Sequence, residues 1–315
     1  MVETRDRTLN FGSMSLTEFN AYLAKEAQTL AKDRGETVDR IRKKIAFDFF
    51  LRRLISRAPG TYVLKGGYAI EVRFHVVRAT KDIDLVVSRS STGEASERHM
   101  PTAEQIRQNL VDHLAEPAGT DDRFVAFRLD PASSLIRGGG GGIQQSARML
   151  IGTQKFTEFS IDLSLADIEH PIKRMQVLRP VIDGFAKEIT CEILGDEQIW
   201  AEKLHAYLRQ GDGFVARTKD FADLVLIGQR GFDFALCHRL IDEVFNYWLE
   251  DKATLTSLPL PPRTGDLLPH PPAAWRQAYA RIAQDLGIPE DIDVAYEFVS
   301  GVFEKVIATQ FANYP

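Results

Sequence analysis

The 315-residue chain is 44% hydrophobic and 26% charged, a mixture typical of globular proteins that excludes wholesale disorder and the fibrous classes. Its formal net charge of −5 argues against nucleic-acid coating by the whole surface, but not against a local basic face. Two cysteines, Cys191 and Cys237, cannot build a disulfide framework, and no apolar run approaches the roughly 18 residues of a membrane span. We expect a cytoplasmic protein that does not meet a membrane.

A loosely held arm over residues 1–15 is expected to precede two helices. Apolar residues recur at helical spacing over 16–32, where Ser15 and Glu18 have the spacing of a capping box. A second amphipathic helix is predicted over 37–56.

The second predicted helix is locally basic. Between Gly35 and Arg57 the chain has seven basic and three acidic residues. Such a helix is either an ordinary solvated face or a surface for a phosphate backbone. In the second case the contacts would come from Arg42, Lys43, Lys44, Arg52 and Arg53, with a further basic pair at Lys173 and Arg174.

The middle of the chain alternates between strand and helix patterns. Strands are predicted over 61–65, 83–87, 124–129, 147–153 and 157–165, and helices over 68–74 and 102–116. Five consecutive glycines, Gly138 to Gly142, fit no regular element. They predict either a flexible hairpin tip or a loop that moves over a substrate.

After about Gly195 the pattern is helical to the end of the chain. Helices are predicted over 197–210, 218–230, 233–250, 273–286 and 290–311, with a proline-rich connection that is ordered at least in part between the third and fourth. We therefore expect an α+β fold with a mixed sheet in a first domain, residues 1–195, and an α-helical second domain, residues 196–315.

Three acidic residues stand on strand patterns. Asp82 and Asp84 alternate with apolar residues, so both project from one face, and Asp162 lies on the polar face of a later strand. Carboxylates held side by side repel one another unless a cation lies between them, and oxygen ligands of this kind suit Mg²⁺. If the two strands are neighbours, three acids converge as in two-metal phosphoryl transfer. The alternative is an exposed polar strand edge.

Gly66 and Gly67 separate a strand from a helix start. Glycines there let backbone amides approach a phosphate, although most Gly-Gly pairs are simply tight connections. No Gly-Lys-Ser or Gly-Lys-Thr follows, so the segment is not a P-loop.

Two successive predicted helices carry a lysine and two acids. Lys203 lies on the first, and Asp220 and Asp223 lie on one face of the second. They form either a structural salt bridge between the helices or a site where Lys203 offsets triphosphate charge and Asp220 holds it or positions a nucleophile.

Four motifs occur in order and together resemble the AbiEii/AbiGii toxin family of nucleotidyltransferases, which includes the mycobacterial MenT toxins. They are Leu64-Lys-Gly-Gly-Tyr-Ala-Ile, Arg78-Ala-Thr-Lys-Asp-Ile-Asp-Leu, Ala201-Glu-Lys-Leu and Arg217-Thr-Lys-Asp-Phe-Ala-Asp-Leu. The resemblance implies a DNA polymerase β-like nucleotidyltransferase core with a helical C-terminal part. It also implies an antitoxin encoded beside the toxin and nucleotide transfer to the 3′ acceptor end of tRNA.

The resemblance also implies roles for individual residues. Gly66 and Gly67 would hold the NTP, Asp82 and Asp84 would bind the metal, and Lys203 and Asp220 would complete the site, with Asp223 a weaker match than Asp220. Asp162 would be a third, variable acid. Related polymerase-like enzymes usually have Gly-Ser in the first motif. Here the missing hydroxyl would be replaced by backbone amides or by Lys65, Arg78 or Thr80.

The sequence thus predicts a nucleotidyltransferase dependent on Mg²⁺ or Mn²⁺ that transfers NMP from an NTP, with tRNA as the expected acceptor, a cognate antitoxin as partner and a monomeric state. Two alternatives stay open. One is an antibiotic nucleotidyltransferase, for which no acidic pocket is evident in the sequence. The other is a nucleotide-binding or interaction module that has lost catalysis.

Overall fold

The computed structural model describes residues 11–76, 80–87, 103–130, 134–135, 142–165, 173–183, 188–209, 214–250 and 259–309. Up to Leu194 the elements are η1 (Phe11–Ser13), α1 (Leu16–Arg34), α2 (Val38–Arg57), β1 (Tyr62–Lys65), α3 (Gly66–Phe74), β2 (Asp82–Val87), α4 (Ala103–Leu114), η3 (Thr120–Asp122), β3 (Val125–Leu129), β4 (Ser134–Leu135), β5 (Gly142–Ile151), β6 (Gln154–Leu165), β7 (Lys173–Leu178) and β8 (Ile189–Leu194). The later elements are α5 (Asp196–Leu208), α6 (Phe214–Arg230), α7 (Phe234–Glu250), η4 (Ala273–Trp275), α8 (Arg276–Leu286) and α9 (Ile292–Ala308).

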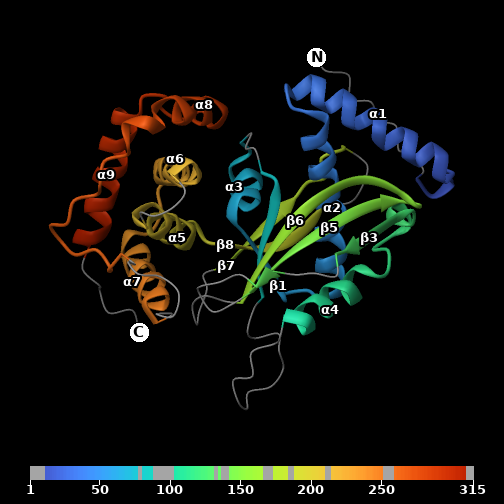
Figure 1. The fold of residues 1–315 in the computed structure, drawn as a ribbon, viewed down its shortest axis with the longest axis horizontal. Coiled ribbons are helices and arrows are strands. Elements are labelled where there is room, and N and C mark those ends of the chain that lie inside the picture. Colours follow the sequence, from blue (N-terminus) through green and yellow to red (C-terminus); the bar gives the residue numbers. More distant parts are fainter. Residues whose placement is uncertain are drawn as a thin grey trace, which may run out of the picture.

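The strands form one mixed sheet in the order β3-β5-β6-β2-β1-β8-β7, with β4 also pairing with β5. The β2–β6 and β1–β8 pairs are parallel, and the other pairs are antiparallel. Figure 1 shows helices α5 to α9 gathered on one side of the molecule and the long strands β5 and β6 on the other. The α+β prediction, with a mixed sheet followed by a helical part, is confirmed.

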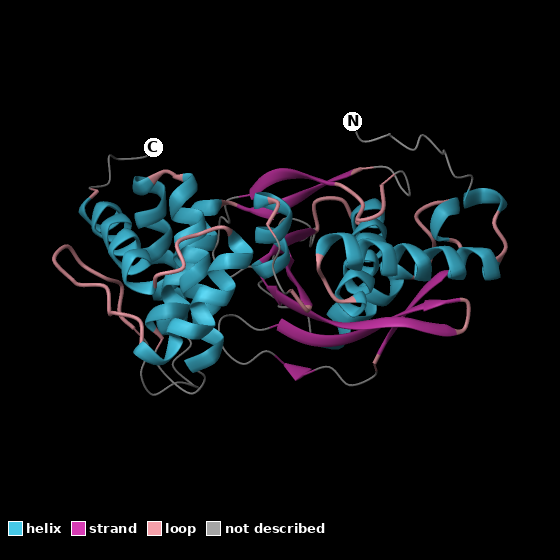
Figure 2. Ribbon diagram, turned by 90° about the horizontal axis from the view of Figure 1, so that it is seen from above, coloured by secondary structure: helices cyan, strands magenta, loops and turns pink. Residues whose placement is uncertain are grey.

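One face of the sheet packs against α2. Ile83 and Leu85 of β2 and Ile161 of β6 join a core that includes Phe47 and Phe50 of α2. Because side chains alternate along a strand, the polar residues between these positions face away from α2. In Figure 2 the helices of the N-terminal part lie over one side of β5 and β6.

A second core joins the helical part to the sheet. Val63 of β1, Val86 of β2 and Ile70 of α3 cluster with residues of α5, α6 and α7, among them the fully buried Trp200 and Phe221. Val63 and Val86 project from one face of the sheet, and Leu64 and Leu85 project from the other. Asp84, two residues before Val86, lies on the same face as Val63 and Val86. The helical part therefore rests on the carboxylate-bearing side of the sheet.

Local signals account for the first helices. Ser15 caps α1, and both halves of the capping box with Glu18 are formed. Gly35 ends the helix in the left-handed conformation that glycine adopts without steric cost. Thr37 then caps α2 by accepting a hydrogen bond from the Arg40 amide.

The structure differs from the predictions in several places. Strands β4, β7 and β8 were not predicted, α3 begins at Gly66, β5 begins at Gly142 and α6 begins at Phe214. The expected arm over 1–15 is packed at its end, because Phe11 is buried against α1. Glycines 138–141 of the predicted hairpin tip lie outside the described residues.

The proline-rich connection is ordered over 259–272, as expected. Leu268 is buried, and the hydroxyls of Tyr207 and Tyr296 donate to the carbonyls of Pro269 and Leu268. Within the described residues, no helix has the length and apolarity needed to cross a membrane.

Candidate active site

Strand register brings the three predicted acids and a lysine together. Lys65 of β1 pairs with Asp84 of β2, and Asp84 pairs with Asp162 of β6. Cross-strand partners share a face, so these side chains form a row across three strands, with Asp82 two residues before Asp84 on the same face. The strand neighbourhood on which the three-acid hypothesis depended is therefore present.

The carboxylates influence one another electrostatically. Burial, reinforced by the nearby Asp82 and Asp162, raises the pKa of Asp84 to about 6, while Lys65 and Lys203 oppose the rise. Burial likewise raises the pKa of Asp162, against the hydrogen bond from Gln144. Like charges held together in this way favour a cation between them.

Gly66 makes room for Asp84. Its φ is +65°, and a Cβ atom there would overlap the Asp84 carboxylate group. A glycine is therefore required for two separate reasons, one conformational and one steric. The result is that the Asp84 carboxylate lies against the first residue of α3, where amide groups are still free of helical partners.

Lys203 connects the sheet carboxylates with the helical part. Its Nζ lies 2.7 Å from Asp220 Oδ1 and 3.0 Å from Asp223 Oδ2, and its charge reaches Asp84. Burial favours the neutral form of Asp220, but Lys203 and Arg217 outweigh it and hold the pKa of Asp220 below its usual value. One of the two alternatives that the sequence left open, a salt bridge between the two helices, is thus formed, and Lys203 also acts electrostatically on Asp84.

The remaining predicted nucleotide contacts are distributed around this row. Gly67 is the second residue of α3 and is buried. Thr80 precedes β2 and is buried, and its hydroxyl has no hydrogen-bond partner among the described residues. Arg78 lies outside the described residues.

The donor set fits a divalent cation that also binds substrate. Among the described residues, no group of three or more His, Cys, Asp and Glu side chains is placed so that it could hold a metal ion. Mg²⁺ does not need such a group, because it commonly takes one or two carboxylates together with substrate phosphates and water. Asp82 and Asp84 supply that number of carboxylates from one face of β2.

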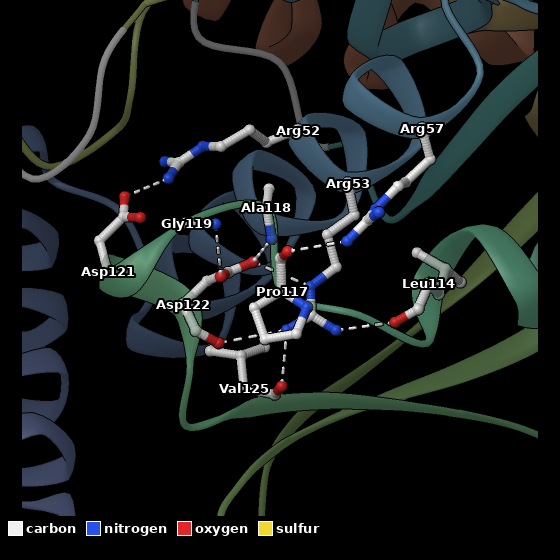
Figure 3. Close-up of polar contacts among 10 residues, drawn as sticks. All are labelled: Arg52, Arg53, Arg57, Leu114, Pro117, Ala118, Gly119, Asp121, Asp122 and Val125. Atoms are coloured by element: carbon white, nitrogen blue, oxygen red, sulfur yellow. Dashed lines mark hydrogen bonds and ion pairs between the residues drawn. The ribbon is translucent and has the colours of Figure 1, made fainter.

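Three of the predicted nucleic-acid contacts on α2 are wrong, because their charges are used inside the protein. Arg53 is 1% exposed and donates to Asp122 Oδ2 at 2.9 Å and to the carbonyls of Leu114 and Val125 (Figure 3). Arg52 is also buried and pairs with Asp121.

Lys44 is the third of these residues. It is buried, with Nζ 2.9 Å from Glu36 Oε2 and 2.5 Å from Glu71 Oε1. A buried cation with one ion partner before α2 and another on α3 stabilises packing and offers nothing to a phosphate backbone.

The other predicted nucleic-acid contacts are partly exposed and paired. Arg42 lies over the Phe156 ring, and Lys43 pairs with Asp39 of its own helix. Lys173 pairs with Glu192 at 3.2 Å. Arg174 Nη2 lies 2.7 Å from a carboxylate oxygen of Glu197, which is 2% exposed.

One contact to the acidic row could not be expected from the sequence. Gln144 Nε2 donates to Asp162 Oδ1 at 2.9 Å, because the two residues are cross-strand partners in β5 and β6. In the sequence, Gln144 is marked only by its position shortly after the five glycines, and that position does not indicate a contact with Asp162.

Comparisons with known proteins identify the family of the chain and proteins of similar fold. The family model described as nucleotidyl transferase AbiEii toxin, type IV toxin–antitoxin system, matches residues 49–304. A search of curated proteins found no significant match. Among solved structures, the fold is similar to MenT4, a nucleotidyltransferase toxin from Mycobacterium tuberculosis, with a TM-score of 0.54, 18% identity, and coverage of 94% of this chain and 91% of the other.

JHP933 from Helicobacter pylori is also similar, with a TM-score of 0.40, 12% identity and coverage of 84% and 91% of the two chains. The family match extends from α2 through the acidic row and the helical part into α9. The chain therefore belongs to the AbiEii nucleotidyltransferase toxin family of type IV toxin–antitoxin systems.

Proposed function

We propose that the protein transfers a nucleoside monophosphate from an NTP to a hydroxyl at the 3′ end of tRNA, which would block translation, and that an antitoxin encoded nearby neutralises it. The observation that supports this most directly is the row of Lys65, Asp84 and Asp162 across three strands, with Lys203 within electrostatic reach. Family membership supports the transferase class. We further propose that tRNA is the acceptor and that the reaction requires Mg²⁺ or Mn²⁺.

The chain's own residues have separate tasks in this reaction. Asp82 and Asp84 would hold Mg²⁺ or Mn²⁺, which when bound neutralises triphosphate charge and polarises the α-phosphate. The amides at the start of α3 are suited to phosphate oxygens. Lys203, held by Asp220 and Asp223, would offset charge that develops on the triphosphate.

The bond changes follow from in-line displacement. The acceptor hydroxyl oxygen forms a bond to the α-phosphorus, and the bond from that phosphorus to pyrophosphate breaks. The hydroxyl proton passes to a carboxylate of the acidic row. Gly66 contributes by leaving Asp84 the space to lie at the helix start.

The test is incubation of the purified protein with each labelled NTP and total tRNA, with and without EDTA. We expect labelled RNA that disappears on chelation and returns with Mg²⁺ or Mn²⁺. Asp84→Asn should lower the rate by orders of magnitude, as for other groups that stabilise charge in the transition state. Asp285→Asn, an exposed acid on α8, is the matched control and should leave the rate unchanged.

Other outcomes would contradict the proposal. Labelling of an aminoglycoside but not of RNA would support the antibiotic-modifying alternative. Nucleotide binding without transfer in the presence of either metal would support the inactive module. Normal incorporation by Asp84→Asn would remove Asp84 from the site.

A further inference from the structure

The acidic row continues into a polar sheet face. Gln144, Ser146 and Arg148 alternate on β5 and are exposed, while Ile143, Gln145 and Ala147 between them are buried. Asp162 pairs with Gln144, and Ser160, the partner of Asp82, pairs with Ser146. The side chains of Asp82, Ser160 and Ser146 therefore lie in a second row beside the first.

Two arginines lie at the β3 edge of this polar sheet face. Arg128 of β3 and Arg148 of β5 are directly opposite one another, an arrangement that costs free energy through repulsion. Asp130 pairs with Arg148. In the part of the chain that the structure describes, no acid pairs with the exposed Arg128.

The arginine pair lines a pocket of about 410 Å³ at the outer edge of β3, where Arg107 of α4 joins it. Arg53 also reaches the pocket, but Asp122 neutralises it. Arg107 pairs with the exposed Glu104 of its own helix, so Arg128 is the pocket arginine for which no acidic partner lies among the described residues. Arginines in a concave site suit the planar, bidentate recognition of phosphate or carboxylate groups.

From these observations, and resting on the function proposed above, we infer that the acceptor RNA lies across this open sheet face, with a backbone phosphate in the pocket of Arg107, Arg128 and Arg148. Arg128 and Arg148 project from the sheet face that carries the acidic row, which favours a phosphodiester over a protein carboxylate. The pocket takes the place of the α2 surface, whose basic side chains are largely used inside the fold.

The distance between the arginine pocket and the acidic row determines how long an RNA must be to reach both. Arg148 is opposite Glu158, four residues from Asp162 on β6. At roughly 3.3 Å per residue along a strand and about 4.8 Å between strands, the pocket is about 16 Å from the acidic row. At about 3.4 Å per stacked nucleotide, that distance spans about five nucleotides.

The test measures binding of fluorescent single-stranded RNA without NTP, using oligonucleotides of about two and about twelve nucleotides. We expect Arg128→Ala to weaken binding of the longer RNA roughly tenfold, the loss expected for one charge-assisted hydrogen bond. It should leave binding of the dinucleotide unchanged. The slope of log affinity against log salt should fall by about 0.7, the value for one phosphate on a single strand.

The matched control is Arg179→Ala, an exposed arginine that follows β7 at the opposite edge of the sheet. It should change neither affinity nor slope. Arg128→Ala should not lower the melting temperature, because it relieves repulsion with Arg148. A fall in melting temperature without a change in affinity would show a structural role and overturn the inference.

The outcomes also separate this inference from the proposed function. If the wild-type protein labels tRNA and Arg128→Ala binds the longer RNA normally, the inference alone is wrong. If RNA binding depends on Arg128 but no NTP labels RNA, the pocket binds RNA as inferred, but the proposed function fails and the bound RNA is not an acceptor. If poly-glutamate binds at Arg128 and RNA does not, the pocket is a protein-docking surface and the inference is overturned.

Discussion

Gly66 and Asp84 show how a single backbone position controls the acidic row. The Asp84 carboxylate occupies the space that any side chain at Gly66 would need. This contact joins β2 to the start of α3, so the glycine is a steric requirement of the site as well as a turn residue.

Gly66→Ala should therefore abolish nucleotide transfer by displacing Asp84. Gly60→Ala is a matched control, since Gly60 has φ +72° but no atom within 4 Å of the position that a Cβ would take. Both variants should lose about 1 kcal/mol to left-handed backbone strain. Only Gly66→Ala should lose more stability and the activity, as measured by thermal unfolding and tRNA labelling. Equal activity of the two variants would argue against the contact.

A partly buried acid of α2, which lies outside the acidic row, makes stability depend on pH. Burial raises the pKa of Asp48 on α2 to about 7, although the Val181 amide donates to it at 2.6 Å and Arg52 and Tyr68 also favour its charged form. The pKa of Asp48 in the folded protein lies above its usual value. The contribution of the protonated Asp48 to the free energy of unfolding is therefore full below about pH 4 and is lost as the pH rises through 7.

Asp48→Asn should therefore stabilise the protein at high pH by on the order of 1–2 kcal/mol and change little near pH 4. Asparagine keeps the acceptor for the Val181 amide but cannot ionise. Melting temperatures across this range provide the measurement. A constant difference between variant and wild type at every pH would contradict the raised pKa.

At the scale of elements, buried acids fix how helices meet the sheet. Glu197, near the start of α5, is paired with Arg174 of β7, and the preceding Asp196 accepts two hydrogen bonds of 3.1 Å from Arg73 of α3. On the other side of the sheet, Asp122 holds Arg53 of α2 in the same way. Acids that follow loops thus pair with arginines far away in sequence.

Arg174→Ala should lower stability by about 1–3 kcal/mol, because it leaves the carboxylate of Glu197 buried with less compensation. Arg179→Ala removes an arginine of an exposed pair with Glu188 and should change stability by less than about 0.5 kcal/mol. Chemical denaturation checks both values. If Arg174→Ala kept full stability but reduced the salt dependence of RNA binding, the earlier nucleic-acid interpretation of Arg174 would be correct.

At the scale of the whole molecule, the two hydrophobic cores share the sheet. The core of the helical part contains Val63 and Val86, while residues next to them in the same strands belong to the other core. The predicted division at residue 195 is thus crossed by packing contacts, although it stays a prediction about domains. Two cores that share strands are expected to unfold together.

This coupling can be tested with the intrinsic probes of the chain. All three tryptophans, Trp200, Trp248 and Trp275, lie in the helical part. Ile161→Val in the other core should cost about 0.5–1.5 kcal/mol and lower the unfolding midpoint by a few degrees. Tryptophan fluorescence and circular dichroism should report the same shift. An unchanged fluorescence midpoint would mean that the two parts unfold separately.

Much of the fold could be predicted because its signals are local. Alternation along β2 and β6 identified the faces that carry Asp84 and Asp162, and capping residues and helical spacing located α1 and α2. Strand β7 was missed because its apolar Met175 and Val177 are exposed, so the pattern of apolar residues along it does not follow burial. The periodicity of apolar residues indicates which face of a segment is buried, but not which strand or helix it packs against.

The sequence by itself determined the order of the motifs, the α+β class and the acids that share a strand face, because each depends on residues close together in the chain. Only the tertiary structure decided which charges are free for a ligand. Arg53 is satisfied by Asp122, 69 residues away, and Arg128 faces Arg148 through strand pairing. Burial and register depend on residues far apart in the chain, so the sequence could not show that Lys44, Arg52 and Arg53 are buried in the fold or that Arg128 lies exposed on the sheet face.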